Sequence, residues 1–451
     1  MNYQFPKDFM WGVGSAAFQI EGAMLEDGKT LNVREASFYE KERRVKFADE
    51  RGPEVCSDFY HRYPEDIKLI GELGAKVFRY SIAWTRIIPN KDGKVNQKGI
   101  DFYNKVIDEM IANGITPFMD LFHSDLPLWL EEEGGIADDR FVDWYADYAE
   151  VCFKAFGDRV KWWSTSNEAK LSVYGAYAFA HMHPFKHDPV LAWKAVQNMN
   201  LAHFEAVRRL RKLWPDAKIG SVNNGGECYC KSFDPEDIAA AKRHVAMQLL
   251  FLDAQILGQY PPEMVDYPKV RACIPDSFFT QLKENFEPMD FYGVNYYCPN
   301  FIRKGDKTYY DTAAFKGDLQ KDAYGFYTYS SGMFDFVTML ADRYNNMPVI
   351  ITENGFAQSR ENVYDQDLEP FRHDQARISY MCEHIRACGR LLRAGVNLKG
   401  YFYWAITDTW EVKKGFTCPM GLVGVNFDTL ERQKRDSYYY YQKIIQHNMV
   451  D

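Results

Sequence analysis

The sequence predicts an α/β protein folded as a (β/α)8 TIM barrel, because strand-like and helix-like segments alternate along the chain. Short apolar runs predict eight strands, at about residues 10, 78, 118, 163, 220, 292, 350 and 401. Segments of helical period separate most of these runs, and a doubly wound sheet rarely needs eight such units. A length of 451 residues leaves room for long loops after the strands. No linker or low-complexity tract interrupts the alternation, so we expect residues 1–451 to form a single domain.

The N-terminal part of the chain begins this alternation with a strand over residues 9–14. Residues 29–52 are charged and poor in glycine, and we interpret this segment as a surface loop. A helix is expected to begin at Pro64, where proline is followed by acidic residues, and to end at Gly74.

The remaining predicted elements continue the same order. Their boundaries come from apolar residues at helical or strand spacing and from the turn residues between them. The expected strands cover residues 77–81, 115–121, 162–167, 218–222, 291–295, 349–353 and 398–404, and the expected helices cover about residues 100–111, 141–156, 190–213 and 374–394.

Two glutamates stand at the ends of predicted strands. Glu353 follows the apolar residues 349–351 and precedes Asn-Gly, and Glu168 follows an aromatic and hydroxyl-rich run ending in Asn167. Glu353 could instead cap the following loop or pair with an arginine, because a buried carboxylate is costly unless it is paired or functional. In a parallel barrel the C-terminal strand ends meet at one face, which would place both acids in one pocket. Two facing glutamates are typical of glycoside hydrolysis.

The charge balance argues against a nucleic-acid or acidic-membrane partner. Lys and Arg number 54 against 63 Asp and Glu, which gives a net charge of −9. The residues 1–8 lack a basic segment followed by an apolar one, and no run of 18 apolar residues occurs. We therefore expect a soluble, acidic, cytoplasmic enzyme that acts on a small molecule; its oligomeric state is not specified by the sequence.

The nine cysteines are odd in number and scattered, which argues against a disulfide framework and favours a reducing compartment. Cys228 and Cys230 form the only close pair, and their spacing matches neither a redox motif nor a usual zinc site. No other cysteine or histidine cluster has metal-ligand spacing, so we expect no metal and no cofactor.

In such a barrel, the residues just past each strand would line the pocket. They combine acids, a guanidinium, amides, a histidine and aromatic rings, which suits a polyol ligand. The residues are Gln19, Arg79, His123, Ser124, Asp125, Asn167, Glu168, Asn295, Tyr296, Tyr297, Glu353 and Trp404.

These segments carry a resemblance that spans nearly the whole chain. The order and spacing of the motifs together are specific, although each alone is weak. The chain resembles family 1 glycoside hydrolases, the retaining β-glucosidase family, at residues 18–22, 79–84, 165–168, 295–297, 351–355 and 401–421.

The resemblance implies a role for each matching residue. It implies that Glu353 is the nucleophile and Glu168 the general acid/base of a retaining exo-β-glycosidase. It further implies that Arg79, Asn295 and Tyr297 support the nucleophile, and that the sugar is contacted by Gln19, His123, Asn167, Trp404 and Glu411. On physical grounds, Arg79 would favour the ionised form of Glu353, while burial and that negative charge would keep Glu168 protonated.

Two departures from the family pattern fall in the sugar pocket. Ser124 and Val412 occupy positions where the family usually has tryptophan, on the side of the sugar around its 3-hydroxyl. Their joint presence predicts a roomier or differently bonded pocket there, and tolerance for a glycon altered at C3.

Other departures concern neighbouring positions. Ala169 stands where the family usually has a proline and Pro419 where an arginine is common, and no physical consequence follows from either change. The phospho-glycosidase branch typically has serine at the position of Glu411, and a lysine and a tyrosine where this chain has Cys418 and Met420. A 6-phosphate pocket is therefore not expected.

Alternative functions share much of this pattern. A β-glycosidase for a non-glucose or C3-modified glycon would use the same carboxylates, as would a transglycosidase. A catalytically weak sugar-binding protein on the same scaffold is a third alternative.

Overall fold

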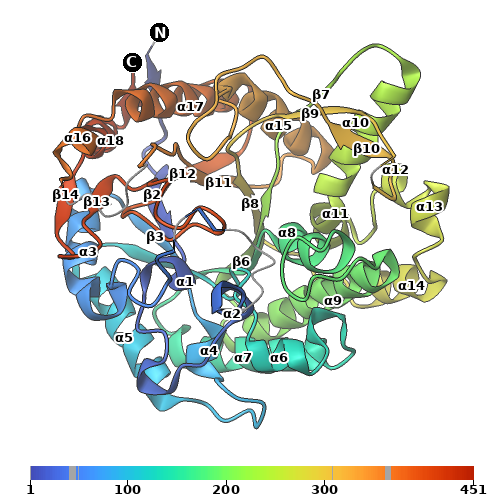
Figure 1. The fold of residues 1–451 in the computed structure, drawn as a ribbon, viewed down its shortest axis with the longest axis horizontal. Coiled ribbons are helices and arrows are strands. Elements are labelled where there is room, and N and C mark those ends of the chain that lie inside the picture. The colour runs from blue at the N-terminus through green and yellow to red at the C-terminus, as the bar shows by residue number, and fades with distance from the viewer. Residues whose placement is uncertain (1, 40–46, 49, 307, 361–366) are drawn as a thin grey trace.

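The computed structural model describes residues 2–39, 47–48, 50–306, 308–360 and 367–451. Eight parallel strands close into a barrel in the order β11-β12-β2-β3-β4-β5-β6-β8 (Figure 1). This arrangement confirms the predicted fold and all eight predicted strands. They are β2 (Met10–Ser15), β3 (Val77–Ser81), β4 (Thr116–Asp120), β5 (Trp162–Asn167), β6 (Lys218–Asn224), β8 (Phe291–Asn295), β11 (Val349–Asn354) and β12 (Leu398–Trp404).

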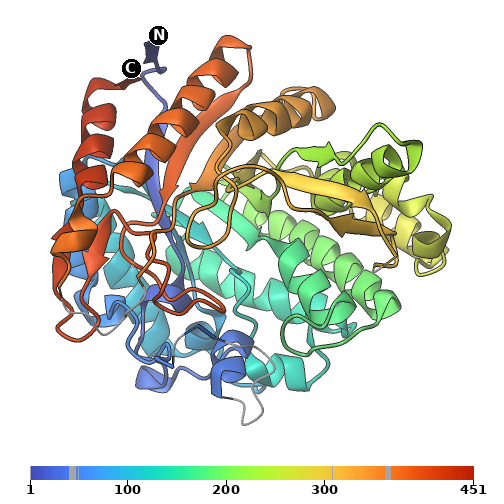
Figure 2. The same cartoon turned by 45° about the horizontal axis from the view of Figure 1, so that its top comes forward.

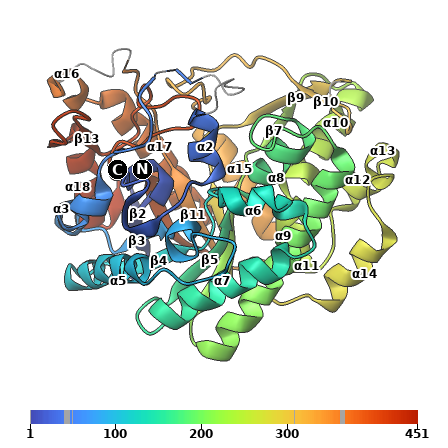
Figure 3. The same cartoon turned by 60° about the horizontal axis from the view of Figure 1, so that its bottom comes forward.

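Most of the long helices surround the barrel and bury their apolar faces against it. Figure 3 shows α5, α7 and α9 side by side along one flank of the strands. The long helices are α3 (Phe59–Leu73), α5 (Gln97–Ala112), α7 (Phe141–Phe156), α9 (Pro189–Leu213), α10 (Pro235–Gln248), α15 (Ser330–Arg343), α17 (Gln375–Arg393) and α18 (Asp436–His447). None of the helices in the described ranges is both long and apolar enough to cross a bilayer.

Shorter helices lie mainly in the loops that follow the strands. They are α1 (Ala17–Ile20), α2 (Val33–Tyr39), α4 (Trp84–Ile87), α6 (Leu128–Glu132), α8 (Ala169–Val173), α11 (Leu250–Leu257), α12 (Pro262–Val265), α13 (Pro268–Arg271), α14 (Asp276–Glu284) and α16 (Glu369–Arg372).

Small sheets complete the fold outside the barrel. β1 (Tyr3–Gln4) pairs with β15 (Met449–Val450), so the two ends of the chain lie together. A sheet of β7 (Cys228–Cys230), β9 (Asn300–Lys304) and β10 (Thr312–Ala314) lies beside α10, away from the barrel (Figure 2). β13 (Val423–Val425) and β14 (Arg432–Lys434) form a hairpin.

The interior of the barrel is apolar at one end and polar at the other. Phe118, Phe291 and Phe402 meet edge to face, with Phe118 ring centroids 5.5 and 5.8 Å from the other two, and Val77 and Ile350 complete this cluster. The polar residues lie further along the same strands, toward their C-terminal ends. The packed layer thus closes the barrel beneath the face on which polar side chains gather.

The start of α3 differs from the prediction. The helix begins at Phe59, and Pro64 lies inside it rather than at its first turn. Burial of Phe59 and a bond from the Tyr60 N–H to the Glu21 carbonyl (3.1 Å) anchor the earlier start. Since proline this close to a helix N-terminus removes only one backbone bond, the helix tolerates it. Gly74 ends the helix as predicted, with φ of 85°.

The interpretation of residues 29–52 as a surface loop is wrong for its described part. The segment contains α2, in which Val33 and Phe38 are buried. Lys29 also forms a buried ion pair with Glu35, at 2.7 Å, which holds the charged side chains inside. Residues 40–46 and 49 of the segment lie outside the described ranges.

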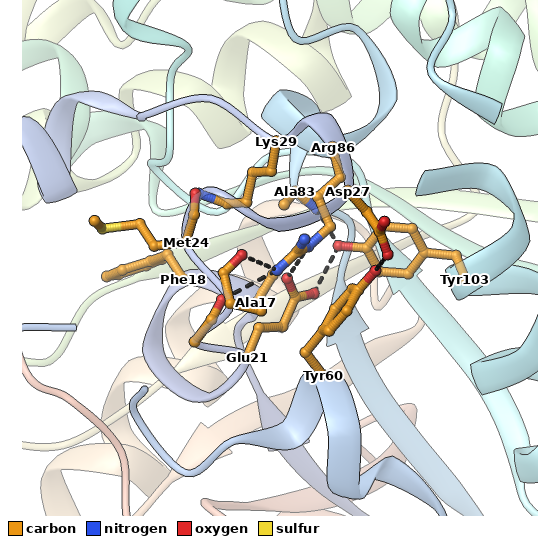
Figure 4. Close-up of polar contacts among 12 residues, drawn as sticks. Ala17, Phe18, Glu21, Met24, Asp27, Lys29, Tyr60, Ala83, Arg86 and Tyr103 are labelled. Carbon is orange, nitrogen blue, oxygen red and sulfur yellow. Dashed lines mark hydrogen bonds and ion pairs between the residues drawn. The ribbon is translucent and has the colours of Figure 1, made fainter. Parts of the chain in front are cut away.

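A buried carboxylate ties the first strand-end turn to the rest of the barrel. Glu21 follows α1, and its Oε2 accepts a 2.6 Å bond from Arg86 Nε (Figure 4). Its Oε1 accepts bonds from the hydroxyls of Tyr80 (2.6 Å) and Tyr103 (2.7 Å). Arg86 also donates to the Gly22 carbonyl at 3.1 Å. These hydrogen bonds to the buried Glu21 carboxylate hold the segment directly after α1 in place.

Replacement of Arg86 by methionine is expected to destabilise the protein by about 3–5 kcal/mol, because it leaves the buried Glu21 carboxylate without its cation. Equilibrium urea unfolding measures this loss. The matched control is Lys98→Met, which breaks an exposed ion pair with Asp27 (2.9 Å) and should leave the unfolding curve unchanged. Similar curves for the two variants would contradict a structural role for the Glu21 cluster.

Candidate active site

Side chains from seven of the eight strand ends and the loops after them surround one cavity of about 610 Å³. This volume is typical of a small-molecule site. The structure brings together most of the predicted site residues in its lining: Gln19, His123, Ser124, Asn167, Glu168, Asn295, Tyr297, Glu353, Trp404, Glu411 and Val412.

Three other predicted residues lie outside the cavity lining. Arg79 is fully buried within the barrel and reaches the site through its hydrogen bonds. The Asp125 carboxylate accepts a bond from the His123 backbone N–H (3.2 Å), and the Tyr296 hydroxyl donates to the Tyr329 carbonyl (2.6 Å). Asp125 and Tyr296 therefore shape the strand-end loops and do not face the ligand space.

Glu353 is held from two sides. Arg79 donates to its Oε1 at 2.6 Å, and the Tyr297 hydroxyl donates to its Oε2 at 2.8 Å. Glu353 belongs to β11, whose neighbours β8 and β12 restrain its backbone. Both carboxylate oxygens thus have a fixed direction before any ligand binds, which is the preorganisation that a nucleophile requires.

Arg79 distributes its charge among three polar groups. Besides Glu353, it contacts Asp120 Oδ2 at 2.5 Å and donates to Asn167 Oδ1 at 2.7 Å. Burial acts to raise the pKa of Asp120, but the Arg79 cation and His123 lower it below its usual value. Asp120 therefore remains ionised and balances part of the Arg79 charge.

Glu168 has a different environment. It caps α8 with φ of 51°, and Asn295 Nδ2 donates to its Oε1 at 2.8 Å. The same Asn295 amide donates to Asn167 at 2.9 Å, which links the two strand ends. Burial raises the pKa of Glu168, while the Asn295 bond and the Lys170 charge oppose this rise. A partly buried carboxyl with one neutral donor and a raised pKa suits proton transfer.

The expected depression of the Glu353 pKa is not what the structure indicates. Burial raises the pKa of Glu353, the Arg79 cation lowers it, and the Glu168 carboxyl raises it again, with a net upward direction. The pKa directions of the two glutamates are therefore the same. What distinguishes them is the hydrogen bonding, since Glu353 has a guanidinium and a phenol and Glu168 has an amide.

Aromatic rings form one wall of the cavity. Trp404, at the end of β12, stacks on His123 with ring centroids 5.6 Å apart and an interplanar angle of 19°. His123 Nε2 lies 3.0 Å from the Asn167 amide, which fixes the position of the ring. Both rings line the cavity, so they can contact the face and hydroxyl groups of a sugar.

Glu411 and Gln19 lie in the loops after β12 and β2. Thr409 Oγ1 donates to Glu411 Oε1 at 2.7 Å, and Gln19 Nε2 donates to the Trp410 carbonyl at 3.2 Å. Burial raises the pKa of Glu411 to about 7, against the hydrogen bonds from Thr409 and Trp404. Glu411 is therefore poised to exchange a proton near neutral pH.

The side of the pocket next to Ser124 and Val412 is partly filled by side chains that the sequence analysis did not identify. Arg34 Nε donates to the Ser124 carbonyl at 3.1 Å, and Ser172 Oγ lies 2.6 Å from Ser124 Oγ. The Tyr324 hydroxyl donates to the Val412 carbonyl at 3.3 Å. The space next to these two smaller side chains is thus bordered by polar groups from distant loops.

Several further lining residues were also missed. They come from α2, α8, the loop before α9, α10, β9 and the segment before α15, and no apolar period or motif marks them. They are Arg34, Lys170, His181, His244, Gln248, Asn300, Tyr324 and Phe326. Only the fold reveals that these residues share a cavity, because they belong to loops and helices far apart in the sequence.

Within the described ranges, no three His, Cys, Asp or Glu side chains are grouped so as to hold a metal ion. Cys228 and Cys230 pack with Ala240, Ala241 and Ile302 in an apolar cluster outside the barrel. Their position accounts for the close spacing through β7, where residues two apart share a face.

The fold and this pair of carboxyls define a barrel of the glycoside-hydrolase class. The family profile described as "Glycosyl hydrolase family 1" matches residues 1–450. The chain is 36% identical over 450 residues to β-glucosidase A of Thermotoga maritima, covering 99% of each chain. It is also 36% identical over 462 residues to 6-phospho-β-glucosidase GmuD of Bacillus subtilis, covering 99% of this chain and 98% of the relative.

Solved structures agree with these matches. The family 1 β-glucosidase of Thermotoga maritima superposes with a TM-score of 0.93 at 36% identity, covering 100% of this chain and 99% of that one. The same enzyme in complex with isofagomine lactam superposes equally, at 0.93 and 35% identity over 100% of both chains. The chain belongs to glycosyl hydrolase family 1.

The raised pKa of Glu411 predicts a pH-dependent contribution to stability. The folded protein holds a proton on Glu411 up to about pH 7, whereas the unfolded chain releases it near 4.5. Because the unfolded state then binds fewer protons, stability falls as pH rises through this window, by at most about 3 kcal/mol.

Replacement of Glu411 by glutamine removes this contribution. The free energy of unfolding of Glu411→Gln relative to the wild type should therefore rise between pH 4.5 and 7 and stay level above. Urea unfolding of both proteins across this range measures the difference. A difference independent of pH would contradict the predicted protonation of Glu411.

Proposed function

We propose that this family 1 enzyme is a retaining exo-β-glycosidase that hydrolyses small β-glycosides. The observation that carries the proposal is the contrast between two carboxyls on one cavity. Arg79 and Tyr297 fix both oxygens of Glu353, at 2.6 and 2.8 Å, whereas Glu168 has a single amide donor. One acid is thereby prepared to form a bond and the other to transfer a proton.

In the first step, Glu353 attacks the anomeric carbon while Glu168 donates its proton to the departing glycosidic oxygen. The products are a glycosyl ester on Glu353 and the free aglycone. In the second step, Glu168 removes a proton from water, which displaces Glu353 and releases the sugar. The anomeric configuration is retained after the two inversions.

Other residues hold the sugar and the nucleophile during these steps. Tyr297 stays protonated, because burial and the negative charge of Glu353 raise its pKa. It can therefore keep donating to Glu353. The Asn167 amide stands between Arg79 and His123, at the edge where it can bond the sugar 2-hydroxyl. Trp404 offers its ring face to the pyranose.

The glycon is expected to lack a 6-phosphate, although one relative is called a 6-phospho-β-glucosidase. Support comes from the lining of the cavity, where Glu411 and Met420 stand instead of a serine and a tyrosine, and from the neighbouring Cys418. A carboxyl such as Glu411 accepts hydrogen bonds from sugar hydroxyls, whereas its ionised form repels a phosphate.

We further infer that residues 1–451 act as one catalytic domain in a reducing compartment such as the cytoplasm. The profile match over nearly the entire chain supports the first inference. The nine cysteines, all free, support the second.

Removal of each carboxyl separates the two proposed roles. Glu353→Ala should lower turnover on the order of 10⁴-fold, because no other group forms the glycosyl ester. Azide should partly restore it and give a product of inverted configuration. Glu168→Ala should lose on the order of 10²- to 10⁴-fold on an unactivated leaving group and far less on a 2,4-dinitrophenyl glycoside. Steady-state kinetics on both leaving groups test this, and equal losses for both variants would show that the roles are wrongly assigned.

Product stereochemistry tests the retaining mechanism independently. A covalent intermediate requires the Glu168 and Glu353 carboxyls to lie about 5–5.5 Å apart, which leaves no room for an attacking water behind the sugar. Proton NMR at early times should therefore show the β-anomer of the released sugar, followed by mutarotation. Initial release of the α-anomer would contradict retention.

A further inference from the structure

Arg34 reaches the sugar pocket from a segment that lies far from the catalytic strands in the sequence. It is the second residue of α2, and its side chain lines the main cavity. It also lines a smaller adjoining cavity of about 20 Å³ with Ser124 and Ser172. Its Nε donates to the Ser124 carbonyl at 3.1 Å, which holds the guanidinium beside the position where the pocket departs from the family pattern.

The two terminal nitrogens of Arg34 have no hydrogen-bond or ion-pair partner among the residues that the structure describes. Arg34 is partly buried, and this lack of a partner sets it apart from several fully buried arginines of the protein. Arg86, Arg377 and Arg435 each pair with a buried carboxylate, at 2.6, 2.8 and 2.7 Å. Arg79 likewise pairs with Asp120 and Glu353. A partly buried guanidinium without a carboxylate leaves donors available to a ligand.

The charge of Arg34 persists at neutral pH. Burial lowers the pKa of Arg34 to about 10, while the acids Asp125 and Glu168 and the phenol of Tyr324 oppose this shift. Burial also raises the pKa of Asp125 to about 7 and that of Glu168 above its usual value. Asp125 is thus partly protonated near neutral pH, and neither Asp125 nor Glu168 forms an ion pair with Arg34 among the described residues. The guanidinium remains a cation whose charge is not matched locally.

A guanidinium with two free N–H edges binds a carboxylate or a sulfate through paired hydrogen bonds. A neutral sugar would use these donors without compensating their charge. The main cavity, at about 610 Å³, is large enough for a pyranose with a substituent and an aglycone. We propose that Arg34 selects β-glycosides whose sugar carries an anionic group, a carboxylate or sulfate, at the 3-position next to Ser124. This proposal rests on the proposed glycosidase function and specifies its substrate class.

The kinetic test compares aryl β-glucosides that are unsubstituted, 3-O-sulfated, 3-O-carboxymethylated and 6-O-sulfated. The wild type should prefer both 3-substituted anions over the unsubstituted and 6-O-sulfated compounds in kcat/KM. Arg34→Gln keeps a hydrogen-bond donor but removes the charge, and should reduce this preference on the order of 10- to 100-fold. Arg34→Lys should restore part of it, because the charge returns without the planar fork.

The matched control is Lys413→Gln. Lys413 is an exposed cation that lines the same cavity, so its removal changes the net charge of the site by the same amount. If selectivity arises from the overall charge of the pocket, both glutamine variants should lose it equally. The proposal requires the loss to be confined to Arg34→Gln.

A binding measurement separates this proposal from the glycosidase function. Glucose, glucose 3-sulfate and glucose 6-sulfate are titrated by calorimetry into Glu353→Gln, with and without Arg34→Gln. Tighter binding of the 3-sulfate that depends on Arg34 supports the proposal, even if no aryl glycoside is hydrolysed and the proposed function fails. Hydrolysis of the neutral glucoside together with weaker binding of the 3-sulfate than of glucose overturns the proposal alone. Preference for the 6-sulfate, or equal selectivity in wild type and Arg34→Gln, also overturns it.

Discussion

The site depends on one buried cation, Arg79, in the interior of the barrel. Its guanidinium is fully buried and joins Asp120, Asn167 and Glu353, which come from three different strands. A charge in this position is tolerated only because each of its edges meets a polar partner. The same bonds that neutralise Arg79 also set the direction of the Glu353 carboxylate. Folding and catalysis therefore share a set of interactions, since the barrel closes around a charge network that the reaction uses.

Around this network, burial decides the protonation of the other acids. Glu168 and Glu411 have raised pKa values because they are desolvated and because the hydrogen bonds they receive come mainly from neutral groups. The Arg79 charge is already shared by Asp120 and Glu353. It therefore does not overcome the effect of burial on Glu168 and Glu411. The pocket thus combines one carboxyl held by a cation and a phenol with carboxyls bonded by neutral groups, and this contrast in hydrogen bonding supports different roles for them in general acid/base chemistry.

The sequence was sufficient for much of the fold because the strands and outer helices carry local signals. Apolar runs located all eight barrel strands, and helical spacing located helices such as α7, whose bounds coincide with the prediction. Pro64 misled the prediction because a proline rule describes where a helix can begin, whereas burial of Phe59 determined where it does begin. Residues 29–52 were misassigned because their charges are compensated inside the fold, by pairs that composition does not show.

The candidate site, like the fold, contains some residues that the sequence could predict and others that it could not. Residues directly after strands, such as Glu168 and Glu353, were predictable because barrel geometry assigns such positions to one face. Arg34 and Tyr324 were not, since their proximity to Ser124 and Val412 arises from the paths of long loops. The sequence indicated that two indoles were absent, and the structure shows which side chains border the space instead. Substrate selectivity is therefore the property least accessible from sequence, because it resides in loop contacts without a period or a motif.

Mass spectrometry of a trapped intermediate tests the role of Glu353 most directly. An aryl 2-deoxy-2-fluoro-β-glycoside with an activated leaving group destabilises the oxocarbenium-like transition states and lets the glycosyl-enzyme accumulate. The substrate should use a glycon that the enzyme hydrolyses. We predict one label per chain on the peptide containing Glu353, formed in step with the loss of activity. A label on Glu168, or on any other residue, would contradict the central claim that Arg79 and Tyr297 prepare Glu353 as the nucleophile.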